Sequence, residues 1–477
     1  MIVFNFIGTR VSFLAREALA FVLLLTVTLA APGFATAAAP GPSGWSSFLH
    51  PFAVDSPWNS RPVSPKLDVQ VVPPSQFPPG FAEGAFSTGV FMAQQSDGPV
   101  TVTGLSGSQG LYDADAETFH DMTIPHWPSD VVPAAGSDGH ADIVDTASGV
   151  IHSFFQLRNV GGQWRATQYA WTPLDGRGWG DPAHYFQGSR AAGVTPTAGL
   201  IRKHEVADGD SMYRHALAMS LTSSGLASNP TYVFPATSAD TNAAASNTGT
   251  VPEGALMMLP YGFDAQRLTT QAARKVAQTL KVYGAYVVDR NAGVPFLVYA
   301  ENGTGLGAQN NAVAADMEKI RVALRRVTSV RSWLDGNNGA TTPNTNLNLL
   351  SMRGTWQTQS GSGQGNYDTL AQAVLMPATP GDTVLVNFSN RALSPLLWAV
   401  PAAGTPHKLT AVTTGGARLR VRLFHPTTSA PLFDSGELEN GESITFPWPA
   451  VYPKTVLNAI SSGTQASSVG AELIRAD

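Results

Sequence analysis

The sequence predicts a mainly β fold: a β-sandwich or jelly-roll-like N-terminal domain with two packed α-helices, followed by a smaller C-terminal β-sandwich. Glycine and proline are frequent, at 46 and 34 of 477 residues, and charged residues make up only 13%. This composition favours many short strands joined by turns. Runs of alternating apolar and polar residues recur along the chain, and only two segments have the apolar spacing of an amphipathic helix.

Residues 1–39 have the order of a cleavable secretory signal. Arg10 and Arg16 precede the apolar run ALAFVLLLTVTLAA, which leads into the small-residue stretch AAPGFATAAAP. The apolar run is shorter than the ~20 residues that cross a bilayer, which argues against a permanent anchor. We therefore expect a secreted or periplasmic protein that is soluble and free of the membrane after signal cleavage.

Composition narrows the classes of partner and cofactor. The formal net charge is −5, and no basic run could follow a phosphate backbone, so nucleic acid is not expected as a partner. The chain has no cysteine, which excludes disulfides and thiolate metal sites. We predict no cofactor and no bound metal, and the sequence leaves the oligomeric state open.

Two helices are predicted in the middle of the chain. Residues Leu268–Tyr283 place apolar side chains on one face, and Gly284 supplies the stop. The neighbouring runs AYVVD and PFLVYA then predict buried strands. A second amphipathic helix is predicted from Ala312 to about Val330.

A polar stretch divides the chain into two folded parts. Residues 335–367 are rich in Asn, Thr, Gly, Ser and Gln and predict a linker between a β-rich domain over 40–334 and a C-terminal β-sandwich over 368–477. The runs TVLVNFS, ARLRVRLFH and ESITFPW are the expected strands of that sandwich. Six of ten tryptophans lie between Trp45 and Trp179, and eight of ten histidines precede Ala216, so any chemistry is expected in the N-terminal domain.

The run GVIHSFFQLRNVGGQWRATQYAWT predicts a β-hairpin around Asn159–Gly162. If Asn159 lies opposite Gly162, Ile151, Phe155 and Leu157 share a buried face. The opposite, solvent-facing side then carries mixed polar and aromatic residues: His152, Phe154, Gln156, Arg165, Thr167, Tyr169 and Trp171. Such a surface suits a sugar, because sugar rings present C–H faces to aromatics and hydroxyls to polar groups. An ordinary half-exposed sheet is the alternative, and a slip of one residue would exchange the two faces.

Further ligand contacts are expected downstream of the hairpin. A long glycine-rich loop supplies Asp175, Arg177 and Trp179, and the run GLIRKHEV supplies Lys203. Together with the hairpin these give the predicted substrate-binding set: His152, Gln156, Arg165, Tyr169, Trp171, Asp175, Arg177, Trp179 and Lys203.

Two cleavage chemistries are compatible with these residues. Glycoside hydrolysis needs two carboxyl groups, for which Asp138 and Glu205 are the predicted pair, with His140 and His215 orienting them or tuning their proton affinity. For His215, a hydrogen-bonded core histidine is the alternative.

The competing reaction is β-elimination from a uronic acid polymer, with His152 and Tyr169 as base and acid. Gln156 and Arg165 would then neutralise the substrate carboxylate.

Two metal sites are weaker alternatives. The run YDADAE places Asp113, Asp115 and Glu117 at alternate positions, as calcium loops do, yet it lacks the glycine and later glutamate of an EF-hand, and a solvated acidic turn is favoured. A zinc site formed by three histidines, His120, His126 and His140, has no helical HxxxH pattern.

Several runs resemble a group of exported bacterial proteins of unassigned activity. They are HPFAVDSPWNSRP, SDGHADIVD, GLIRKHEV with YRHALAMSL, TYVFPATSAD and VPEGALMML. The resemblance covers residues 50–300 approximately and implies that the binding or catalytic unit is N-terminal and the last domain accessory.

The sequence as a whole predicts a secreted carbohydrate-active enzyme that cleaves a polysaccharide, with glycoside hydrolysis slightly ahead of elimination. A non-catalytic carbohydrate-binding or cell-surface interaction protein is the remaining alternative.

Overall fold

The computed structural model describes residues 44–105, 109–308, 310–360, 363–387 and 392–476. The predicted signal, residues 1–39, lies outside the described residues. The fold is mainly β, as predicted, and is built from several sheets with few helices. Within the described ranges, no helix combines the length and the apolar character needed to span a membrane.

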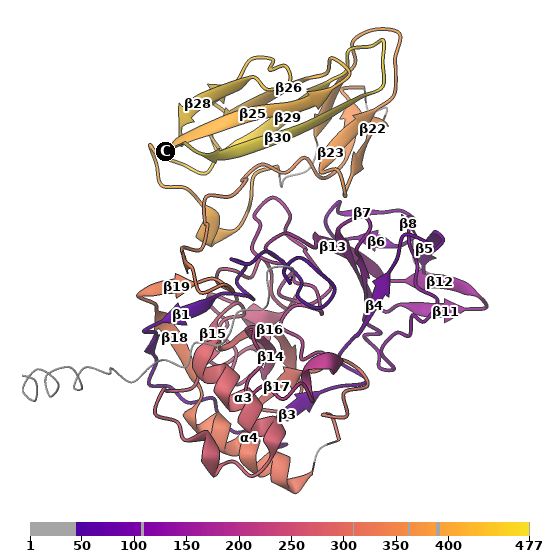
Figure 1. The fold of residues 1–477 in the computed structure, drawn as a ribbon. Helices are drawn as coiled ribbons and strands as arrows, with labels where there is room; N and C mark the ends of the chain where they lie inside the picture. The colour runs from indigo at the N-terminus through magenta and orange to yellow at the C-terminus, as the bar shows by residue number, and fades with distance from the viewer. Residues whose placement is uncertain (1–43, 106–108, 309, 361–362, 388–391, 477) are drawn as a thin grey trace, which may run out of the picture. The chain divides into compact units, whose positions relative to one another are not determined.

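A seven-stranded mixed sheet forms the centre of the N-terminal part. In spatial order its strands are β2 (Lys66–Leu67), β18 (Arg325–Ser329), β15 (Leu256–Met258), β16 (Ala285–Asn291), β14 (Leu217–Thr222), β17 (Phe296–Tyr299) and β3 (Gly80–Ala82). Helices α3 (Gln271–Val282) and α4 (Asn311–Ala323) lie side by side below this sheet (Figure 1). The two predicted helices and the two strands that follow the first of them are therefore present.

The second helix is shorter than predicted. It ends at Ala323, because Leu324 takes an extended conformation and the chain continues as strand β18 instead of reaching Val330 as a helix. The helical apolar spacing runs on into that strand, since Leu324 is itself a core residue. Periodicity alone could not mark the boundary.

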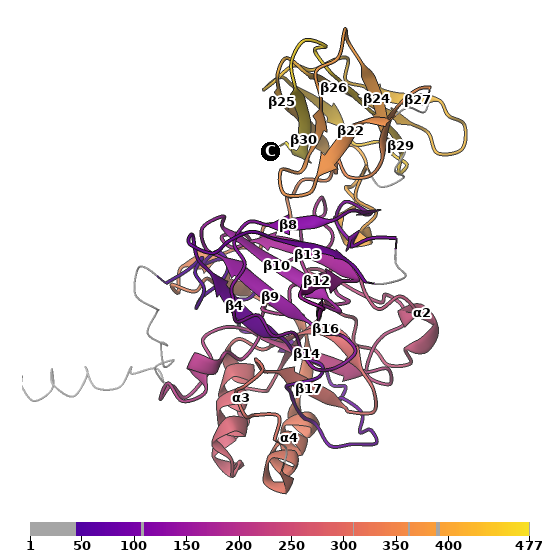
Figure 2. The same cartoon turned by 90° about the vertical axis from the view of Figure 1, so that its right-hand side faces the viewer.

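A six-stranded and a four-stranded sheet carry the region of the predicted hairpin (Figure 2). The first consists of β4 (Gly89–Ala93), β9 (Ala141–Asp145), β10 (Val150–Phe155), β13 (Gln168–Pro173), β6 (Tyr112–Asp113) and β7 (Thr118–Phe119). The second consists of β11 (Arg158–Val160), β12 (Gln163–Ala166), β5 (Val100–Gly104) and β8 (Met122–Ile124). Smaller elements complete this part: β1 (Arg61–Val63), β19 (Ser332–Leu334), β20 (Ala340–Thr341), α2 (Ala243–Ser246), η1 (Lys203–Glu205) and η2 (Ala265–Arg267).

The hairpin forms two residues out of the predicted register. Val160 pairs with Gln163 around a tight turn of Gly161 and Gly162, whose φ values of 60° and 87° are left-handed. Glycine tolerates this conformation in two-residue hairpin turns. Up to Phe155 a shift of two residues keeps each side chain on its predicted face, so His152 still shares a face with Trp171. Beyond Gln156, whose φ is 57°, the prediction is wrong: Leu157 and Ala166, predicted to share the face of Ile151, lie in the core that contains Phe154 and Tyr169.

Both large sheets of the N-terminal part bury both of their faces. In β14, Leu217 and Met219 face the core under the helices, whereas Ala216 and Ala218 face a second core that contains Trp58. The six-stranded sheet adds Val144 and Ile151 to this second core. Its opposite face joins a third core with the four-stranded sheet, made by Val102, Ile124, Ile143, Phe154, Tyr169 and Trp171. The side of the hairpin predicted to be open to solvent is therefore interior.

The C-terminal β-sandwich begins earlier than predicted. Its ten described strands are β21 (Trp356–Thr358), β22 (Gly363–Asp368), β23 (Ala373–Met376), β24 (Val384–Asn387), β25 (Pro406–Thr414), β26 (Arg418–Phe424), β27 (Pro431–Asp434), β28 (Ser443–Pro447), β29 (Lys454–Ile460) and β30 (Ser467–Arg475), with the short helix η3 (Leu397–Ala399). Strands β24, β26 and β28 confirm the three predicted runs. Leu350, Met352 and Trp356, which lie inside the predicted linker 335–367, pack in the core of the sandwich. These few apolar residues are not recognisable as core positions in the sequence, because the residues around them are polar.

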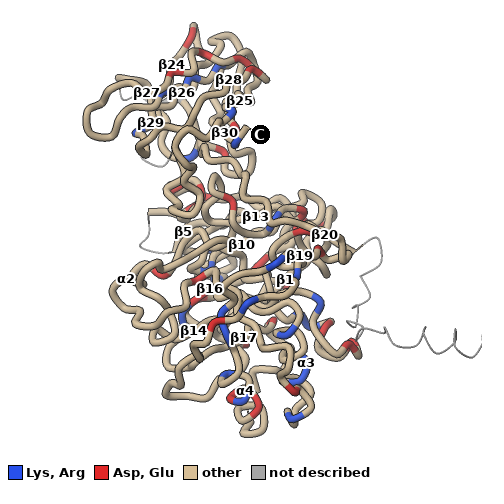
Figure 3. The backbone as a smooth tube through the Cα atoms, turned by 90° about the vertical axis from the view of Figure 1, so that its left-hand side faces the viewer, with Lys and Arg blue, Asp and Glu red and all other residues tan. Residues whose placement is uncertain are grey.

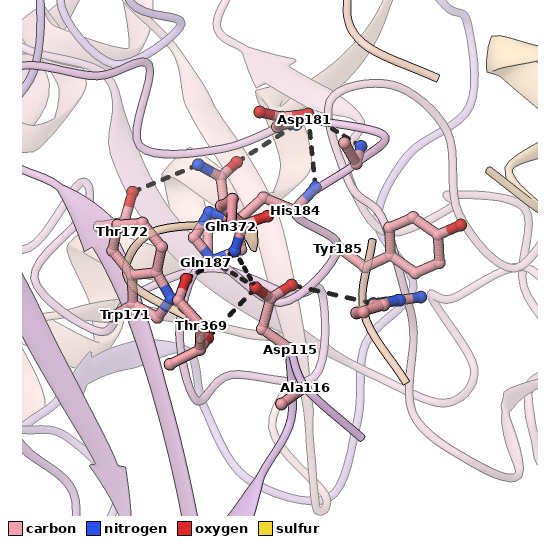
Figure 4. Close-up of polar contacts among 12 residues, drawn as sticks. Asp115, Ala116, Trp171, Thr172, Asp181, His184, Tyr185, Gln187, Thr369 and Gln372 are labelled. Atoms are coloured by element: carbon pink, nitrogen blue, oxygen red, sulfur yellow. Dashed lines mark hydrogen bonds and ion pairs between the residues drawn. The ribbon is translucent and has the colours of Figure 1, made fainter. Parts of the chain in front are cut away.

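A buried charged cluster joins the turn after β6 to the C-terminal residues (Figure 4). Asp115 is 0% exposed and accepts hydrogen bonds from Gln372 and Thr369. Arg353, also 0% exposed, lies with Nη1 3.9 Å from Asp115 Oδ1 and stacks on the Tyr185 ring at 3.2 Å. Burial raises the pKa of Asp115, and the nearby cations partly offset this effect. The solvated acidic turn predicted here is wrong.

We expect Asp115→Ala to destabilise the protein by about 3–5 kcal/mol, because it leaves the buried Arg353 guanidinium with only the partly exposed carboxylate of Glu117 beside it. Urea unfolding followed by tryptophan fluorescence measures the change. Asp434→Ala is the control, since it removes a partly exposed ion pair with Arg420 and should cost at most about 1 kcal/mol. Equal losses in the two variants would contradict the importance of the buried cluster.

Candidate functional site

The hairpin residues predicted for β-elimination are inside the core. His152, Tyr169 and Trp171 are only 1%, 0% and 5% exposed. His152 Nδ1 lies 2.8 Å from the Tyr169 hydroxyl, so the predicted base and acid do meet, but where no polymer can reach them. Half of the four-stranded sheet that covers this face, strands β5 and β8, comes from residues 100–124, which the hairpin sequence cannot reveal. The predicted groove is corrected accordingly.

The other hairpin residues and Trp179 also have structural partners. Gln156 accepts a hydrogen bond from Thr167, and Arg165 donates to Gln163 at 3.1 Å. Trp179 is fully buried and donates its Nε1–H to the carbonyl of Ala192 at 2.8 Å. These residues, predicted to contact substrate, stabilise the fold instead.

The predicted hydrolase pair is not brought together at one cavity. Glu205 lines a cavity whose residues do not include Asp138. Asp138 lies in the turn before β9, where its carbonyl accepts from the backbone N–H of Gln156. His140 is buried beside Ser189, and burial lowers the pKa of its imidazole to about 3, with a smaller effect from Arg190. His140 therefore orients neither carboxyl group.

Glu205 and His215, two of the predicted catalytic residues, are in direct contact. His215 Nε2 lies 3.1 Å from Glu205 Oε1, and its Nδ1 lies 2.9 Å from the carbonyl oxygen of Ala216. Because both nitrogens face acceptors, both bonds form only when the imidazole carries two protons. Burial opposes the charges of both groups, but their mutual attraction outweighs it. The pKa of Glu205 falls to about 2, and that of His215 rises.

This ion pair lines a small cavity of about 30 Å³, which we call the histidine cavity. Its other lining residues include Trp45, His50, Trp58, Asn59 and Arg202. These residues come from three separate parts of the chain: the N-terminal segment, the residues around η1 and the residues just before β14.

Close packing around Gly199 builds the wall of the histidine cavity. Gly199 has a φ of 65°, and a Cβ atom there would lie 2.5 Å from Trp58 Cζ3. Only glycine therefore allows the chain to pass this close to the indole. Three residues later, at the N-cap of η1, the backbone N–H of Arg202 donates to Glu205 at 2.8 Å and fixes the carboxylate.

Two further histidines lie beside the ion pair. The ring centroid of His50 lies 5.9 Å from that of Trp45 and 6.3 Å from that of His204. Burial lowers the pKa of both His50 and His204, although the nearby Glu205 carboxylate raises it in part. The cluster thus joins one imidazolium, held by a carboxylate, to two imidazoles that favour the neutral form.

A larger cavity of about 440 Å³ lies on the other side of the Pro57–Ser60 segment. We call it the aromatic cavity, and its walls include Arg177, Phe234, Tyr286, Arg326 and Trp333. Pro57 and Ser60 line the aromatic cavity, whereas Trp58 and Asn59 line the histidine cavity. The SPWN motif is therefore the partition between the two.

The remaining predicted contacts have different positions. Arg177 lines the aromatic cavity and donates to the carbonyl of Asn344. Asp175, two residues earlier, is exposed. Lys203 is exposed next to the histidine cluster, and its Nζ lies 3.3 Å from Glu301 Oε1.

Acidic and basic residues are intermingled over the strands and helices (Figure 3). The electrostatic potential at either cavity is therefore determined by the charged residues next to it and not by a large patch of one sign. Among the residues that the structure describes, no group of three or more His, Asp or Glu side chains is arranged to hold a metal ion.

Sequence reasoning missed most of the cavity residues. His50 and Trp58 belong to the run HPFAVDSPWN, which carries the resemblance to exported proteins, yet neither was assigned a role. Tyr286 lies in the run AYVVD, which predicts only a buried strand. Trp333 stands alone before the polar stretch, with no local pattern to mark it. These residues come together only in the folded chain, so no local sequence pattern marks them as cavity residues.

Comparisons with known proteins do not assign the chain to a family. No protein-family model matches the chain, and no curated protein matches it. The glycosylation-associated protein complex (Gap123) of Streptococcus agalactiae matches with 18% identity over 23% of this chain and 39% of that chain, at a TM-score of 0.18. The chain thus spans about two fifths of that protein's length.

Two further solved structures match comparably. The N-terminal cellulose-binding domain of Cellulomonas fimi β-1,4-glucanase C matches with 15% identity over 26% of this chain and 88% of that chain, at a TM-score of 0.17. A structure described as "CBM4 structure and function" has 17% identity over 26% and 95%, at 0.16. At such TM-scores the matches carry no argument about fold or ligand.

The buried histidines make stability depend on pH. Burial lowers the pKa of His140 to about 3 and that of His152 to about 4, below the ordinary value of about 6.5. The unfolded chain therefore binds these protons first. Their contribution to stability is present above pH ~6.5 and is lost as the pH falls toward 4, with a slope of about 1.4 kcal/mol per pH unit for each group.

We expect His152→Asn to lower the slope of the unfolding free energy with pH by about 1.4 kcal/mol per pH unit, the contribution of one titrating group. The amide oxygen of asparagine can still accept from the Tyr169 hydroxyl, but it does not titrate. Urea unfolding at a series of pH values between about 4 and 8 measures it. The slopes of variant and wild type should coincide near pH ~8, where neither state takes up a proton at this position. An unchanged acid slope would show that His152 is not the titrating group.

Proposed function

We propose that the protein is an exported carbohydrate-binding protein and that it binds its ligand in the aromatic cavity. Export is supported by the signal-like order of residues 1–39, with its basic start, apolar run and small-residue end. Carbohydrate binding is supported by one observation above all, the combination of aromatic rings and guanidinium groups around a cavity of ligand size.

The cavity volume of about 440 Å³ suits a small ligand. Ligand sites commonly have ~300–1,000 Å³, mostly apolar walls and a few polar groups that fix orientation. Here the rings of Tyr286, Trp333 and Phe234 provide flat apolar surface for the C–H face of a sugar. Asp55 and Ser60 add oxygen acceptors for hydroxyl groups at the same wall.

The arginines favour a sugar that carries a carboxylate. Arg177 Nε is buried and has no hydrogen-bond partner among the described residues, so a ligand oxygen can meet it without displacing a protein contact. Arg326 is held in place by Asp68 at 2.8 Å and by the carbonyl of Thr250 at 3.2 Å. Because Asp68 balances the charge of Arg326, Arg177 is the guanidinium left to meet a ligand carboxylate.

The proposal does not extend to the cleavage reactions predicted from the sequence. The carboxyl pair for glycoside hydrolysis does not line this cavity, and the base and acid for elimination are in the core. Binding needs neither set of residues.

Trp333→Leu tests the aromatic wall, because leucine keeps apolar volume at this position but removes the flat ring. We expect about 5-fold weaker binding of oligosaccharides, as stacking on an aromatic ring contributes on the order of 1 kcal/mol. Titration calorimetry with a panel of neutral and uronic acid oligosaccharides measures it. Tyr261→Ala is the control, since this exposed tyrosine lies outside the aromatic cavity. Failure of the wild-type protein to bind any member of the panel would refute the proposed function.

Arg177→Gln tests the preference for an acidic sugar. Loss of a charged hydrogen bond should weaken uronic acid binding by about 10–100-fold. Neutral oligosaccharides should lose much less, and added salt should weaken only the acidic ligands. Equal losses for both classes of sugar would show that Arg177 acts by shaping the cavity and not by its charge.

A further inference from the structure

The histidine cavity plays no part in the proposed binding function, yet it has the features of a ligand site. Trp58, only 1% exposed, lines this cavity, and its buried Nε1–H has no hydrogen-bond partner among the described residues. Buried donors are rarely left unsatisfied. The cavity volume of about 30 Å³ is large enough for a water molecule, and polar groups surround it.

Two of the surrounding groups are locked in their charged forms. Glu205 accepts from His215 and from the backbone of Arg202, so its carboxylate stays ionised. Both N–H groups of His215 are committed, one to Glu205 and one to the carbonyl of Ala216. Neither residue can therefore donate a proton to a leaving group without breaking this network.

His50 differs from both. Across the described chain its imidazole makes only ring contacts, with Trp45 and His204, and it lines the same cavity. The charged groups that face it are Glu205, His215 and Arg202. A neutral imidazole with a free nitrogen, next to a water-sized space, is suited to act as a general base.

We propose that the histidine cavity is a hydrolytic site in which His50 activates a water molecule for attack on an ester carried by a carbohydrate. The carbohydrate nature of the substrate rests on the proposed function, whereas the ester chemistry rests on this cavity alone. Trp58 positions the water through its indole N–H, and Glu205 and His215 are positioning residues that fix the local charge.

The step balances without a further reactant. A ring nitrogen of His50 takes one proton from the water as its oxygen forms a bond to the ester carbonyl carbon. The carbonyl electron pair moves onto oxygen, which gives a tetrahedral intermediate. When the pair returns, the bond to the sugar oxygen breaks and that oxygen takes the proton from His50. The products are a carboxylic acid and a free sugar hydroxyl.

An ester fits this site better than the two reactions predicted from the sequence. Glycoside hydrolysis needs a protonated carboxyl group, and the carboxyl group lining this cavity, Glu205, is held ionised. Elimination uses no water and needs a free cation for the substrate carboxylate. Arg202 is instead bonded to Glu301 at 2.9 Å and to the carbonyl of Phe48 at 3.0 Å.

The test uses the mature protein with p-nitrophenyl acetate and acetylated xylan, and acetate release is followed by NMR. We expect His50→Gln to lower the rate by about 100-fold or more, as loss of a general base does. We expect Trp58→Phe, which removes only the N–H donor, to lower it by about 3–10-fold. The wild-type rate should rise with pH through a pKa below the ordinary histidine value and then level off.

The controls separate this proposal from nonspecific imidazole chemistry and from carbohydrate binding. His425→Gln, in the C-terminal sandwich, should hydrolyse both esters at the wild-type rate. Calorimetric binding of deacetylated xylan oligosaccharides to the wild-type protein, measured beside p-nitrophenyl acetate hydrolysis, makes a failure of the proposed function visible by itself. Absence of acetate release, a wild-type rate in folded His50→Gln, or unsaturated products absorbing in the ultraviolet would each overturn the ester proposal.

Discussion

The stacked indoles of Trp58 and Trp179 are the contact on which both cavities depend. Their ring centroids lie 5.3 Å apart and their planes are within 17° of parallel. Tyr286 meets both rings edge-on, at 5.3 Å and 5.7 Å. Trp58 lines the histidine cavity and Tyr286 lines the aromatic cavity, so one aromatic cluster supplies a wall to each. Trp179, which the sequence predicted to contact substrate, instead packs against both Trp58 and Tyr286.

Burial on both faces of the N-terminal sheets explains how a chain without cysteine holds such sites in place. The seven-stranded sheet has helices on one side and the Trp58 core on the other, and the six-stranded sheet closes that core from the opposite direction. Polar groups inside these layers are tolerated where they are paired. Glu205 with His215 and Asp115 with Arg353 are such pairs, whereas His140 and His152 are kept neutral by burial.

Local pattern predicted most of the secondary structure but not what covers each element. Periodicity located both helices, and alternation located the hairpin and the C-terminal strands. The face of His152 and Tyr169 was grouped correctly, yet its exposure was wrong, because strands β5 and β8 of the covering sheet come from residues 100–124, far from the hairpin in sequence. Glu205 and His215 were both predicted as functional, and they touch. His50 was missed because it lies about 150 residues upstream of Glu205, and no local pattern reports contacts at that separation.

The partition between the cavities has a chemical consequence. The segment Pro57–Ser60 is a turn, in which the backbone N–H groups of Asn59 and Ser60 donate to the carbonyl of Ser56. It sends Trp58 and Asn59 to one side and Pro57 and Ser60 to the other, so a single turn forms the wall. A carbohydrate held in the aromatic cavity would place a substituent near the histidine cavity only by passing around this segment. Residues of the SPWN motif would then set which substituent positions reach His50. Carbohydrate binding and proton transfer would then be linked through the position of this segment, although different side chains carry out the two functions.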